Sequence, residues 1–575
     1  MLNFILPYTK KYKWQAFLSP LMMLLEVIVD ILSPILMANM VNIGIANSNS
    51  GYVIRLGLIM VALAFFAGLM GMLSSHFGAT AGFGIANELR KDAYHKVQSF
   101  SFQTIDRLSV PSLITRLTTD AETIGMVAMM TLRLGIRAPF LFLFALIFAI
   151  RLDRELSFIF FIAIPLVIFI LYFILNKAMP YFSSIRKKID GINAVVKEQL
   201  EGIRVIKSFN RQDYAREHFR EKNKDFRIVN IQALNIILIL GPAMLAMIFA
   251  CITAVLWFGG NRVYLGTMQA GNILAFLTYI GQIMVALALL SMYIINLSYG
   301  LASLKRIKEL MESTSEIQEK EDPIQTWNDS SIAFEDVSFT YPGLKKNVLD
   351  HINLFVPSGM VLGIIGSTGS SKSTLVQMLP RHYDVDEGVL KIGGINIKDY
   401  DLHFLREQIA YVLQESILIS GTIRSNLLWG KKDASDKEMI QALKDSLAWD
   451  FVKSYDDQLD HIVEQGGSNF SGGQKQRLSI ARALIKRPKI LILDDSSSAL
   501  DTKTDARLRE NIRNNYPDTT ILFIAQRVES IKNCDKILVM ENGRIVAFDS
   551  HDELMKTSPT YQAIVSSQER GNKNA

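Results

Sequence analysis

Six apolar stretches, each near the length that crosses a lipid bilayer, lie before residue 300 and constrain the fold more than any other feature. A hydrocarbon core of about 30 Å takes about 20 residues at helical rise. We place the stretches at residues 17–37, 56–75, 136–150, 156–175, 234–258 and 273–297, and we expect the short third one to start earlier. The sequence therefore predicts an all-α membrane domain of six helices.

Composition excludes a single compact soluble domain and a disordered chain. Of the 575 residues, 50% are hydrophobic and only 20% are charged, with a net charge of +6. That charge is too balanced for a nucleic-acid-binding stripe. Cys251 and Cys534 lie far apart and have no metal-site spacing, which favours a reducing compartment. Glu26 and Asp30 interrupt the first stretch, so we do not expect it to be a cleaved signal peptide.

The connections between the apolar stretches predict the orientation in the membrane. Those after the second and fourth stretches are long and helical in composition, whereas the others are short. Residues 176–233 carry 13 Lys and Arg against 7 Asp and Glu, and Lys10, Lys11 and Lys13 precede the first stretch. Because positive charge is enriched on the cytoplasmic side, the N-terminus and both long connections are predicted to be cytoplasmic.

The character of the chain changes after residue 310. Residues 311–330 are polar and are interpreted as a linker. Short β-branched runs at residues 331–339, 361–365, 490–493, 520–524 and 536–540 then alternate with helix-like stretches. This pattern is typical of an α/β domain. We therefore expect a membrane domain at 1–310, a linker at 311–330 and an α/β domain at 331–575.

A glycine- and serine-rich loop follows the strand predicted at 361–365 and precedes an apolar helix. The loop consists of Gly366, Ser367, Thr368, Gly369, Ser370, Ser371, Lys372, Ser373 and Thr374. Strand, loop and helix in this order form a nest of backbone N–H groups for phosphate, in which Lys372 reaches the β- and γ-phosphates and Ser373 meets Mg²⁺. The general pattern has glycine where this chain has Ser371. A serine-rich loop without a ligand is the alternative interpretation.

A second element supports nucleotide binding. Four apolar residues at 490–493 end in Asp494 and Asp495, which is typical of a strand buried on both faces that carries a carboxylate to the edge where nucleotides bind. Asp494 would bind Mg²⁺ directly or through water. The alternative is a buried strand followed by two solvated acids.

A third motif makes the resemblance to a family specific. It consists of Phe470, Ser471, Gly472, Gly473 and Gln474, followed by Lys475, Gln476 and Arg477. It resembles the signature of ATP-binding cassette (ABC) proteins, although alone it could be a helix cap. Six spans before one cassette resemble an exporter half-transporter. The resemblance implies an α/β P-loop nucleotide-binding domain, ATP and Mg²⁺ as ligands, and a multi-pass protein of a plasma (inner) membrane.

Other positions match the family residue by residue. Tyr341 resembles the aromatic residue that stacks on adenine, although packing in the core is its alternative role. Gln414 resembles the glutamine that senses Mg²⁺ and the attacking water. Two short segments also match the family. One resembles the loop that crosses between paired nucleotide domains and consists of Ser498, Ala499, Leu500 and Asp501. The other resembles the segment that contacts the membrane domain and consists of Glu464, Gln465, Gly466 and Gly467.

Two catalytic positions of the family are altered in this chain. Asp495 stands where the family has the glutamate that orients water, and Gln526 stands at the switch histidine. A carboxylate withdrawn by one methylene is misplaced by about 1 Å, which can cost on the order of 10²-fold in rate. The signature is intact. The chain therefore resembles the degenerate-site subunit of heterodimeric multidrug exporters, whose partner supplies the missing groups. Tolerated drift in a working ATPase is the alternative.

Two segments in the long connections resemble the coupling helices that dock into cassettes. They are residues 109–120 and 209–219, the second of which usually contacts the partner subunit in the family. Closure of an ATP sandwich would then turn the helices from inward- to outward-facing. Solvated helix turns are the alternative interpretation of both segments.

Glu26 and Asp30 share one face of the first predicted span. An ionised acid at that depth costs about 2.5–3.5 kcal/mol, so both should face a polar cavity or partner. They either line the transport path and favour cationic amphipathic substrates, or make helix-packing hydrogen bonds in the protonated form. Met and Phe residues could form an adaptable lining for apolar ligands, or simply pack. They are Met22, Met23, Phe65, Phe66, Met244, Met284 and Met292.

The sequence thus predicts one half of an ATP-driven exporter of hydrophobic drugs. The expected partners are a second half-transporter, membrane lipid and a hydrophobic small molecule, and no nucleic acid. The alternatives are a regulatory or ATP-gated subunit that binds nucleotide without pumping, and an exporter of lipids or peptides. The six spans exclude a soluble cassette that acts on DNA or ribosomes.

Overall fold

The chain folds into two compact units. The computed structural model describes residues 2–496 and 500–573. One unit comprises Met1–Lys96 with Pro111–Glu312, and the other comprises Val97–Val110 with Ser313–Ala575. The second unit thus includes a short segment from the first long connection in addition to the α/β domain.

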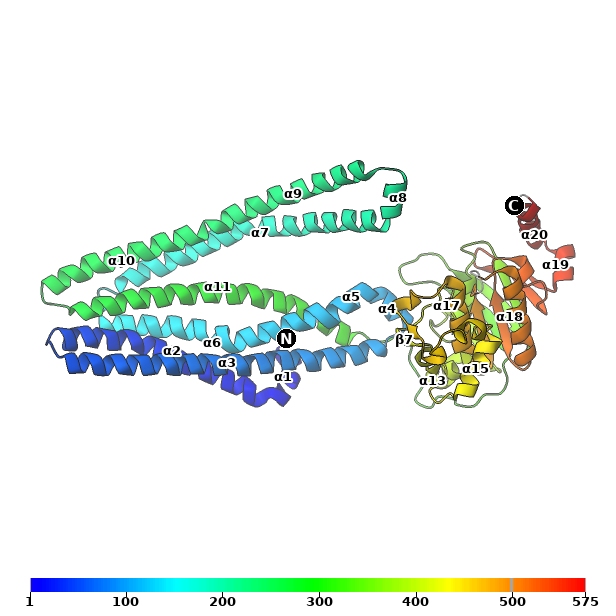
Figure 1. Ribbon diagram of the computed structural model, residues 1–575, viewed down its shortest axis with the longest axis horizontal. Helices are drawn as coiled ribbons and strands as arrows, with labels where there is room; N and C mark the ends of the chain where they lie inside the picture. Colours follow the sequence, from blue (N-terminus) through cyan, green and yellow to red (C-terminus); the bar gives the residue numbers. More distant parts are fainter. Residues whose placement is uncertain (1, 497–499, 574–575) are drawn as a thin grey trace. The chain divides into compact units, whose positions relative to one another are not determined.

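The first unit is entirely helical, and its described part contains six helices long and apolar enough to cross a membrane (Figure 1). Its helices are α1 (Leu2–Thr9), α2 (Lys13–Asn39), α3 (Ser50–Gln98), α5 (Val110–Thr115), α6 (Ala121–Leu152), α7 (Phe158–Glu201), α8 (Ile203–Ser208), α9 (Gln212–Leu238), α10 (Leu240–Tyr264) and α11 (Ala270–Glu312). The 3₁₀-helix η1 (Lys10–Tyr12) precedes α2, and π-helical turns η2 (Met40–Ile45) and η3 (Arg116–Asp120) follow α2 and α5. As expected, the third span begins well before residue 136.

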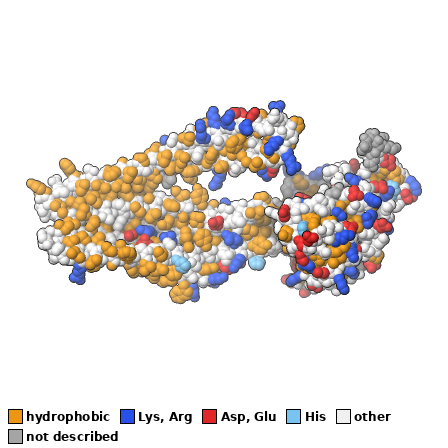
Figure 2. Space-filling model, viewed as in Figure 1, with side chains coloured by type: hydrophobic (Ala, Val, Ile, Leu, Met, Phe, Trp, Pro, Cys, Tyr) orange, Lys and Arg blue, Asp and Glu red, His pale blue; other side chains and the backbone are white. Residues whose placement is uncertain are grey.

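The core of this unit lies where α2, α6 and α11 pack together. Fully buried Tyr279 of α11 donates a hydrogen bond to the carbonyl of Ile31 in α2 at 3.0 Å. Phe276 stacks on Phe160 of α7 with ring centroids 6.0 Å apart. Helices α7 and α9 run antiparallel and are joined by α8 (Figure 1). Much of the apolar surface of the unit is exposed (Figure 2), as lipid-facing helices require.

The second unit is an α/β domain built on a six-stranded sheet in the order β12-β11-β3-β10-β9-β6, next to a four-stranded antiparallel sheet, β2-β1-β4-β5. The strands are β1 (Ile332–Phe339), β2 (Leu349–Val356), β3 (Val361–Gly366), β4 (Glu387–Ile392), β5 (Ile395–Asn396), β6 (Ile409–Val412), β7 (Gly421–Thr422), β8 (Ile462–Val463), β9 (Ile490–Asp494), β10 (Thr520–Ile524), β11 (Lys536–Glu541) and β12 (Arg544–Asp549). In the six-stranded sheet only β12 is antiparallel.

Helices surround these sheets. They are α4 (Phe102–Leu108), α12 (Lys372–Gln377), α13 (Leu402–Gln408), α14 (Ile423–Leu428), α15 (Asp436–Asp445), α16 (Trp449–Val452), α17 (Gly472–Leu484), α18 (Thr502–Asn515), α19 (His551–Thr557) and α20 (Pro559–Lys573), with 3₁₀ turns η4 (Ile397–Asp399), η5 (Gln458–Asp460), η6 (Gln465–Gly467) and η7 (Val528–Ser530). Continuous apolar runs such as that of β9 are buried because helices cover both faces of a parallel sheet.

The register of the parallel strands positions the site. Ile524 of β10 pairs with Ile364 of β3 on one side and with Asp494 of β9 on the other. The carboxyl ends of the three strands therefore meet at one edge of the sheet. In open α/β sheets, ligands bind at this edge.

Candidate nucleotide-binding site

The loop after β3 is held close to the neighbouring strand. A Cβ atom on Gly366 would lie 2.2 Å from the carbonyl oxygen of Met540, so only glycine fits there. Lys372 lies across the loop, and its Nζ donates to the carbonyls of Gly366 at 3.0 Å and Ser367 at 2.9 Å. Burial lowers the pKa of Lys372. The lysine is therefore placed over the same turn whose backbone N–H groups would face a phosphate.

Ser371 shows why the general pattern has glycine before the lysine. Its backbone is left-handed, with φ 71° and ψ 23°, immediately before α12 begins. A residue with a Cβ pays about 1–2 kcal/mol for this conformation, which glycine adopts freely. The serine is thus accommodated in the nest at the cost of local backbone strain.

Asp494 is the centre of the polar cluster at the end of β9. Ser373 Oγ donates to its Oδ1 at 3.0 Å, and Tyr411 Oη donates to its Oδ2 at 2.9 Å. Burial raises the pKa of Asp494, and the two hydrogen bonds act against that rise. A hydroxyl and a carboxylate are oxygen ligands that Mg²⁺ prefers, and the ion usually completes its shell with water and substrate phosphates. Ser373 and Asp494 therefore fit the metal role predicted for them.

The two altered catalytic positions contact each other. Gln526 Nε2 donates to Oδ2 of Asp495 at 2.7 Å. Burial raises the pKa of Asp495, and this hydrogen bond opposes the rise. Asp495 also has a left-handed backbone, with φ 46°. The carboxylate is thus engaged by a neutral amide, which cannot carry a positive charge.

A cavity of about 780 Å³ joins the loop, both aspartates and the switch position. The predicted site residues that line it are Gly366, Ser367, Thr368, Gly369, Ser371, Lys372, Ser373, Thr374, Gln414, Asp494, Asp495 and Gln526. Ser370 is buried beneath the loop and does not line the cavity. Gln414 reaches the cavity from the segment after β6. Four separate stretches of sequence therefore converge on one space large enough for a nucleotide.

Tyr341 lies beside α12 instead of at the cavity wall. Its hydroxyl is within 3.2 Å of Thr374 Oγ1 and donates to Gln377 Oε1 at 3.2 Å. Its ring meets that of Tyr383 edge to face, with centroids 5.3 Å apart. The adenine-stacking role of Tyr341 remains a prediction.

The signature residues begin α17 and do not line this cavity. Ser471 is the N-cap of α17, and its side chain and that of Gln474 form a reciprocal capping box. Gly472 and Gly473 form the first helical turn. Of the loop expected to cross between paired domains, Ser498 and Ala499 lie outside the described residues, whereas Asp501 caps α18 by accepting from the backbone N–H of Thr504 at 2.9 Å.

Comparisons with known proteins identify the family. Residues 16–287 match the description "ABC transporter transmembrane region" and residues 349–498 match "ABC transporter". This chain belongs to the ABC transporter family. It is similar to the uncharacterized ABC transporter ATP-binding protein YfiB of Bacillus subtilis, at 34% identity over 98% of both chains. Its identity to the uncharacterized ABC transporter ATP-binding protein MT1311 of Mycobacterium tuberculosis is 32%, over 99% of this chain and 98% of that one.

The fold of this ABC transporter is that of an exporter half-transporter. A solved structure, described as a bacterial Atm1-family ABC exporter with ATP bound, aligns with a TM-score of 0.81 over 97% of this chain and 98% of that chain. The two sequences are 21% identical, so this likeness concerns the fold alone. It agrees with the six-helix membrane domain followed by an α/β nucleotide-binding domain that the sequence predicts.

The motifs of the ABC transporter did not reveal every residue at its nucleotide cavity. Tyr411 bonds Asp494, and further lining residues are Val348, Met540, Glu541, Thr560, Ala563, Ile564, Ser567 and Gln568. Tyr411 could have been found, because it lies near the carboxyl end of a strand next to β9. The last five belong to α20, a helix whose sequence carries no nucleotide motif.

The helix α4 packs on the nucleotide-binding domain of the transporter. Phe102 lies against His382, with ring centroids 4.3 Å apart, and Asp106 accepts a hydrogen bond from Tyr383 Oη at 2.6 Å. Burial lowers the pKa of His382 to about 3 and raises the pKa of Tyr383. Ser101 and Thr104 of the same segment both donate to Glu316.

This position of α4 corrects the prediction for the first coupling segment. We expected residues 109–120 to dock, but α4 ends at Leu108, and Pro111–Glu312 belongs to the membrane unit. The prediction took the middle of the connection in the sequence, which is 109–120. In the structure α3 ends at Gln98, so the chain turns before α4 and not at the middle of the connection. The second segment, 209–219, spans the turn from α8 to α9, and its docking remains a prediction.

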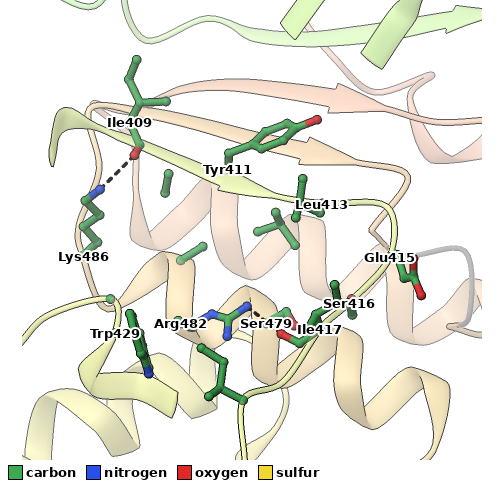
Figure 3. A pocket seen from close by; sticks show the side chains of 15 residues that line it. Ile409, Tyr411, Leu413, Glu415, Ser416, Ile417, Trp429, Ser479, Arg482 and Lys486 are labelled. Carbon is green, nitrogen blue, oxygen red and sulfur yellow. Dashed lines mark hydrogen bonds between the residues drawn. The ribbon is translucent and has the colours of Figure 1, made fainter. Parts of the chain in front are cut away.

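A second, smaller cavity of about 370 Å³ lies between α17 and the segment that follows β6 (Figure 3). Arg482 of α17 donates to the carbonyl of Ile417 at 3.0 Å, and Lys486, which follows the end of α17, donates to that of Ile409 at 3.0 Å. Trp429 lies on its rim and is 69% exposed.

In the membrane unit, Glu26 and Asp30 face a polar partner, as predicted from their cost in lipid. Arg137 of α6 makes ion pairs with both, at 3.1 Å to Asp30. The amide of Gln282 in α11 donates to the backbone carbonyl of Asp30 at 2.7 Å. Figure 2 shows charged side chains surrounded by apolar surface within this unit. The acids are thus members of an ion triad, a partner arrangement that the sequence did not specify.

Proposed function

We propose that this ABC exporter half-transporter is one subunit of a heterodimer that exports hydrophobic or cationic amphipathic compounds, including drugs. Its own pocket binds ATP with Mg²⁺ and hydrolyses it slowly. Its signature completes the catalytic site of a second half-transporter. The N-terminus and the nucleotide-binding domain lie in the cytoplasm of a cell with the protein in its plasma (inner) membrane, which the positive charge of the long connections supports.

The observation that carries the proposal is the hydrogen bond between Asp495 and Gln526. In the family, the residues at these positions orient water and contact the γ-phosphate. Here the carboxylate is one methylene shorter, its oxygen is occupied by an amide at 2.7 Å, and the amide has no charge to offer the transition state. Lys372, Ser373 and Asp494 retain the geometry to bind ATP and Mg²⁺.

The place of the signature supports a paired assembly. Ser471, Gly472 and Gly473 open α17, and none of them lines the cavity that contains the phosphate loop of the same chain. Backbone N–H groups at a helix N-terminus bind anions. A sandwiched ATP would therefore receive its phosphate loop from one subunit and this helix from the other.

The ion triad supports the substrate class. Two carboxylates share one guanidinium, so the group has an excess negative charge, and Glu26 Oε2 is buried with no hydrogen-bond partner among the described residues. A cationic head group entering beside α2 would meet that charge. The test is transport of matched cationic and neutral compounds by Glu26→Gln with Asp30→Asn. If the double substitution leaves the transport of both compounds equally unaffected, the acids do not set this substrate preference.

The experiment that tests the heterodimer begins with co-purification from native membranes, which identifies the partner. The chain alone should bind ATP and hydrolyse it slowly, whereas the pair should hydrolyse it rapidly. In a pair whose partner carries an amide at its catalytic glutamate, Asp495→Glu with Gln526→His should raise turnover by up to about 10²-fold. Asp518→Glu with Gln562→His is the matched control. Brisk hydrolysis by the unmodified chain alone would overturn the proposal.

Transport distinguishes the exporter from a regulatory or ATP-gated subunit. Vesicles that contain the pair should accumulate substrate against a gradient when ATP is supplied. Passive equilibration that depends on ATP would support gating instead and would overturn the export function.

A further inference from the structure

The helix α20 forms one wall of the nucleotide cavity. Thr560, Ile564, Ser567 and Gln568 line the same space as Lys372. None of the nucleotide-binding motifs accounts for these residues.

The core of the domain fixes the orientation of α20. Tyr561 is fully buried, and its hydroxyl lies 2.8 Å from Nδ1 of His551. Val565 follows one turn later and is 9% exposed, and both residues belong to the core beneath the six-stranded sheet. Residues spaced by four and seven positions share a helix face. Gln568 therefore continues the anchored face and is directed at the loop after β10.

Gln568 bonds this loop at two backbone groups. Its Oε1 accepts from the N–H of Val528 at 2.8 Å, and its Nε2 donates to the carbonyl of Gln526 at 2.7 Å. The intervening Arg527 is extended, with φ −102° and ψ 129°. An amide side chain paired with the C=O and N–H of residues i and i+2 reproduces the bonding of a neighbouring strand. The loop cannot rotate about Arg527 without breaking both bonds.

We propose that Gln568 is a positioning residue of the ATP site, which clamps the switch loop so that the side chain of Gln526 faces Asp495. Strand β10 ends at Ile524, and Gln526 follows it after Ala525. The direction of the Gln526 side chain therefore depends on the backbone that Gln568 holds. Gln568 bonds the backbone of Gln526 and Val528, so the clamp holds the switch position at the cavity and not the loop 366–374. The inference rests on the cavity being the ATP site and does not depend on the heterodimer.

The direct test is hydrogen exchange in the full, paired transporter. Gln568→Ala should increase the exchange rate of the Val528 amide at least about tenfold, because that N–H loses its acceptor. Gln562→Ala is the control, since Gln562 lies on the same helix but donates to the carbonyl of Met555 and does not line the cavity. Gln568→Glu keeps an acceptor for Val528 and loses the donor for Gln526, so its effect should be intermediate.

A kinetic measurement separates positioning from general structure. With the partner's own pocket disabled, Gln568→Ala should change the residual turnover several-fold, because Gln526 is no longer held against the carboxylate of Asp495, and should change the dissociation constant for ATP less than twofold. Unchanged exchange at Val528, an equal effect of Gln562→Ala, or faster exchange throughout 551–565 would each overturn the clamp. Rapid hydrolysis by this chain's pocket would contradict the degenerate site and leave the clamp intact.

Discussion

Two neighbouring side chains, those of Ser373 and Tyr411, set the environment of the Asp494 carboxylate. Ser373 belongs to the phosphate loop and was predicted from its motif, whereas Tyr411 comes from β6 and was not. Both donate hydrogen bonds to the carboxylate, at 3.0 and 2.9 Å. Burial raises the pKa of Asp494 and the donors lower it, so the balance decides when the ionised form is available for Mg²⁺.

Replacing Tyr411 should therefore change the pH dependence of metal binding. Tyr411→Phe keeps the ring and removes one donor, so the pKa of Asp494 should rise further. Because Mg²⁺ needs the carboxylate, the acid limb of Mg²⁺-dependent nucleotide binding should move to higher pH. A lost hydrogen bond to a charged group is worth about 1.5–3 kcal/mol, so the acid limb should move by about one to two pH units. Fluorescent-nucleotide binding measured against Mg²⁺ at several pH values checks this.

The control for that measurement is Tyr516→Phe. Tyr516 also donates to a buried aspartate, Asp445, at 3.0 Å, but neither residue lines the nucleotide cavity. The control should leave Mg²⁺ binding unchanged. Identical pH profiles for Tyr411→Phe and the unmodified protein would contradict the role of this tyrosine.

The sequence predicted residues that belong to contiguous motifs and missed those that depend on tertiary packing. Lys372, Ser373 and Asp494 could be proposed from the sequence because a loop and an apolar strand with a terminal acid are local patterns, and the structure places all three at one cavity. The contact of Gln526 with Asp495 depends on the pairing of β10 with β9, in which Ile524 opposes Asp494. Gln568 lies 42 residues from Gln526, so no local pattern could indicate their contact.

At the scale of elements, the contact of α4 with the nucleotide-binding domain depends on a neutral histidine. His382 is packed between Phe102 and Tyr411, with ring centroids 4.3 and 5.7 Å away. Burial, with a smaller effect from Arg406, lowers its pKa to about 3. The folded protein therefore binds no proton at this residue in the range where the unfolded chain does.

This difference in protonation makes His382 a source of acid lability. Its pKa in the folded protein lies below the unfolded value of about 6.5. Above about pH 6.5 the histidine is neutral in both states and costs no stability. As the pH falls from about 6.5 toward 3, only the unfolded chain binds the proton, so the free energy of unfolding decreases progressively. His382→Phe removes that loss, which amounts to about 2 kcal/mol at pH 5. The gap in melting temperature between pH 8 and pH 5 should therefore be smaller in the variant than in the unmodified protein. Equal gaps would contradict a buried neutral histidine.

The ion triad connects helices α2 and α6, and its charges predict how substitutions there change stability. Removing one member of a buried ion pair costs about 3–5 kcal/mol, because a charge is left without its partner, whereas removing all members is nearly neutral. Arg137→Gln should therefore lower the melting temperature and the membrane yield. Adding Glu26→Gln and Asp30→Asn should restore both.

Arg151→Gln near the end of α6 is the control for the triad, since it removes a cation from the same helix without touching Glu26 or Asp30. It should leave stability unchanged. If the triple variant is as unstable as Arg137→Gln alone, the helices are not joined by charge. The sequence placed the acids on one face of α2, but it could not name Arg137, because the choice of neighbouring helix is set by the packing of α2, α6 and α11.

At the scale of the whole transporter, the proposed heterodimer makes the two ends of one nucleotide domain unequal. In that proposal, the phosphate loop of this chain would serve its own slow pocket, while Ser471 would serve the partner's fast one. Ser471 caps α17 through the N–H of Gln474 and sits where anions approach a helix. Damage at Ser471 should therefore cost far more turnover than damage at Lys372.

Two variants of this chain in the purified pair measure that inequality. Ser471→Arg should reduce ATP turnover by about 10²–10³-fold, as loss of a donor to a transition-state charge does, whereas Lys372→Met should reduce it less than about fivefold. Ser435→Arg is the matched control, because Ser435 caps α15 through the same capping box but lies away from the signature in the sequence. Equal losses from Ser471→Arg and Lys372→Met would mean that both pockets hydrolyse ATP at similar rates. The asymmetry, and with it the division of binding and hydrolysis between two subunits, would then be wrong.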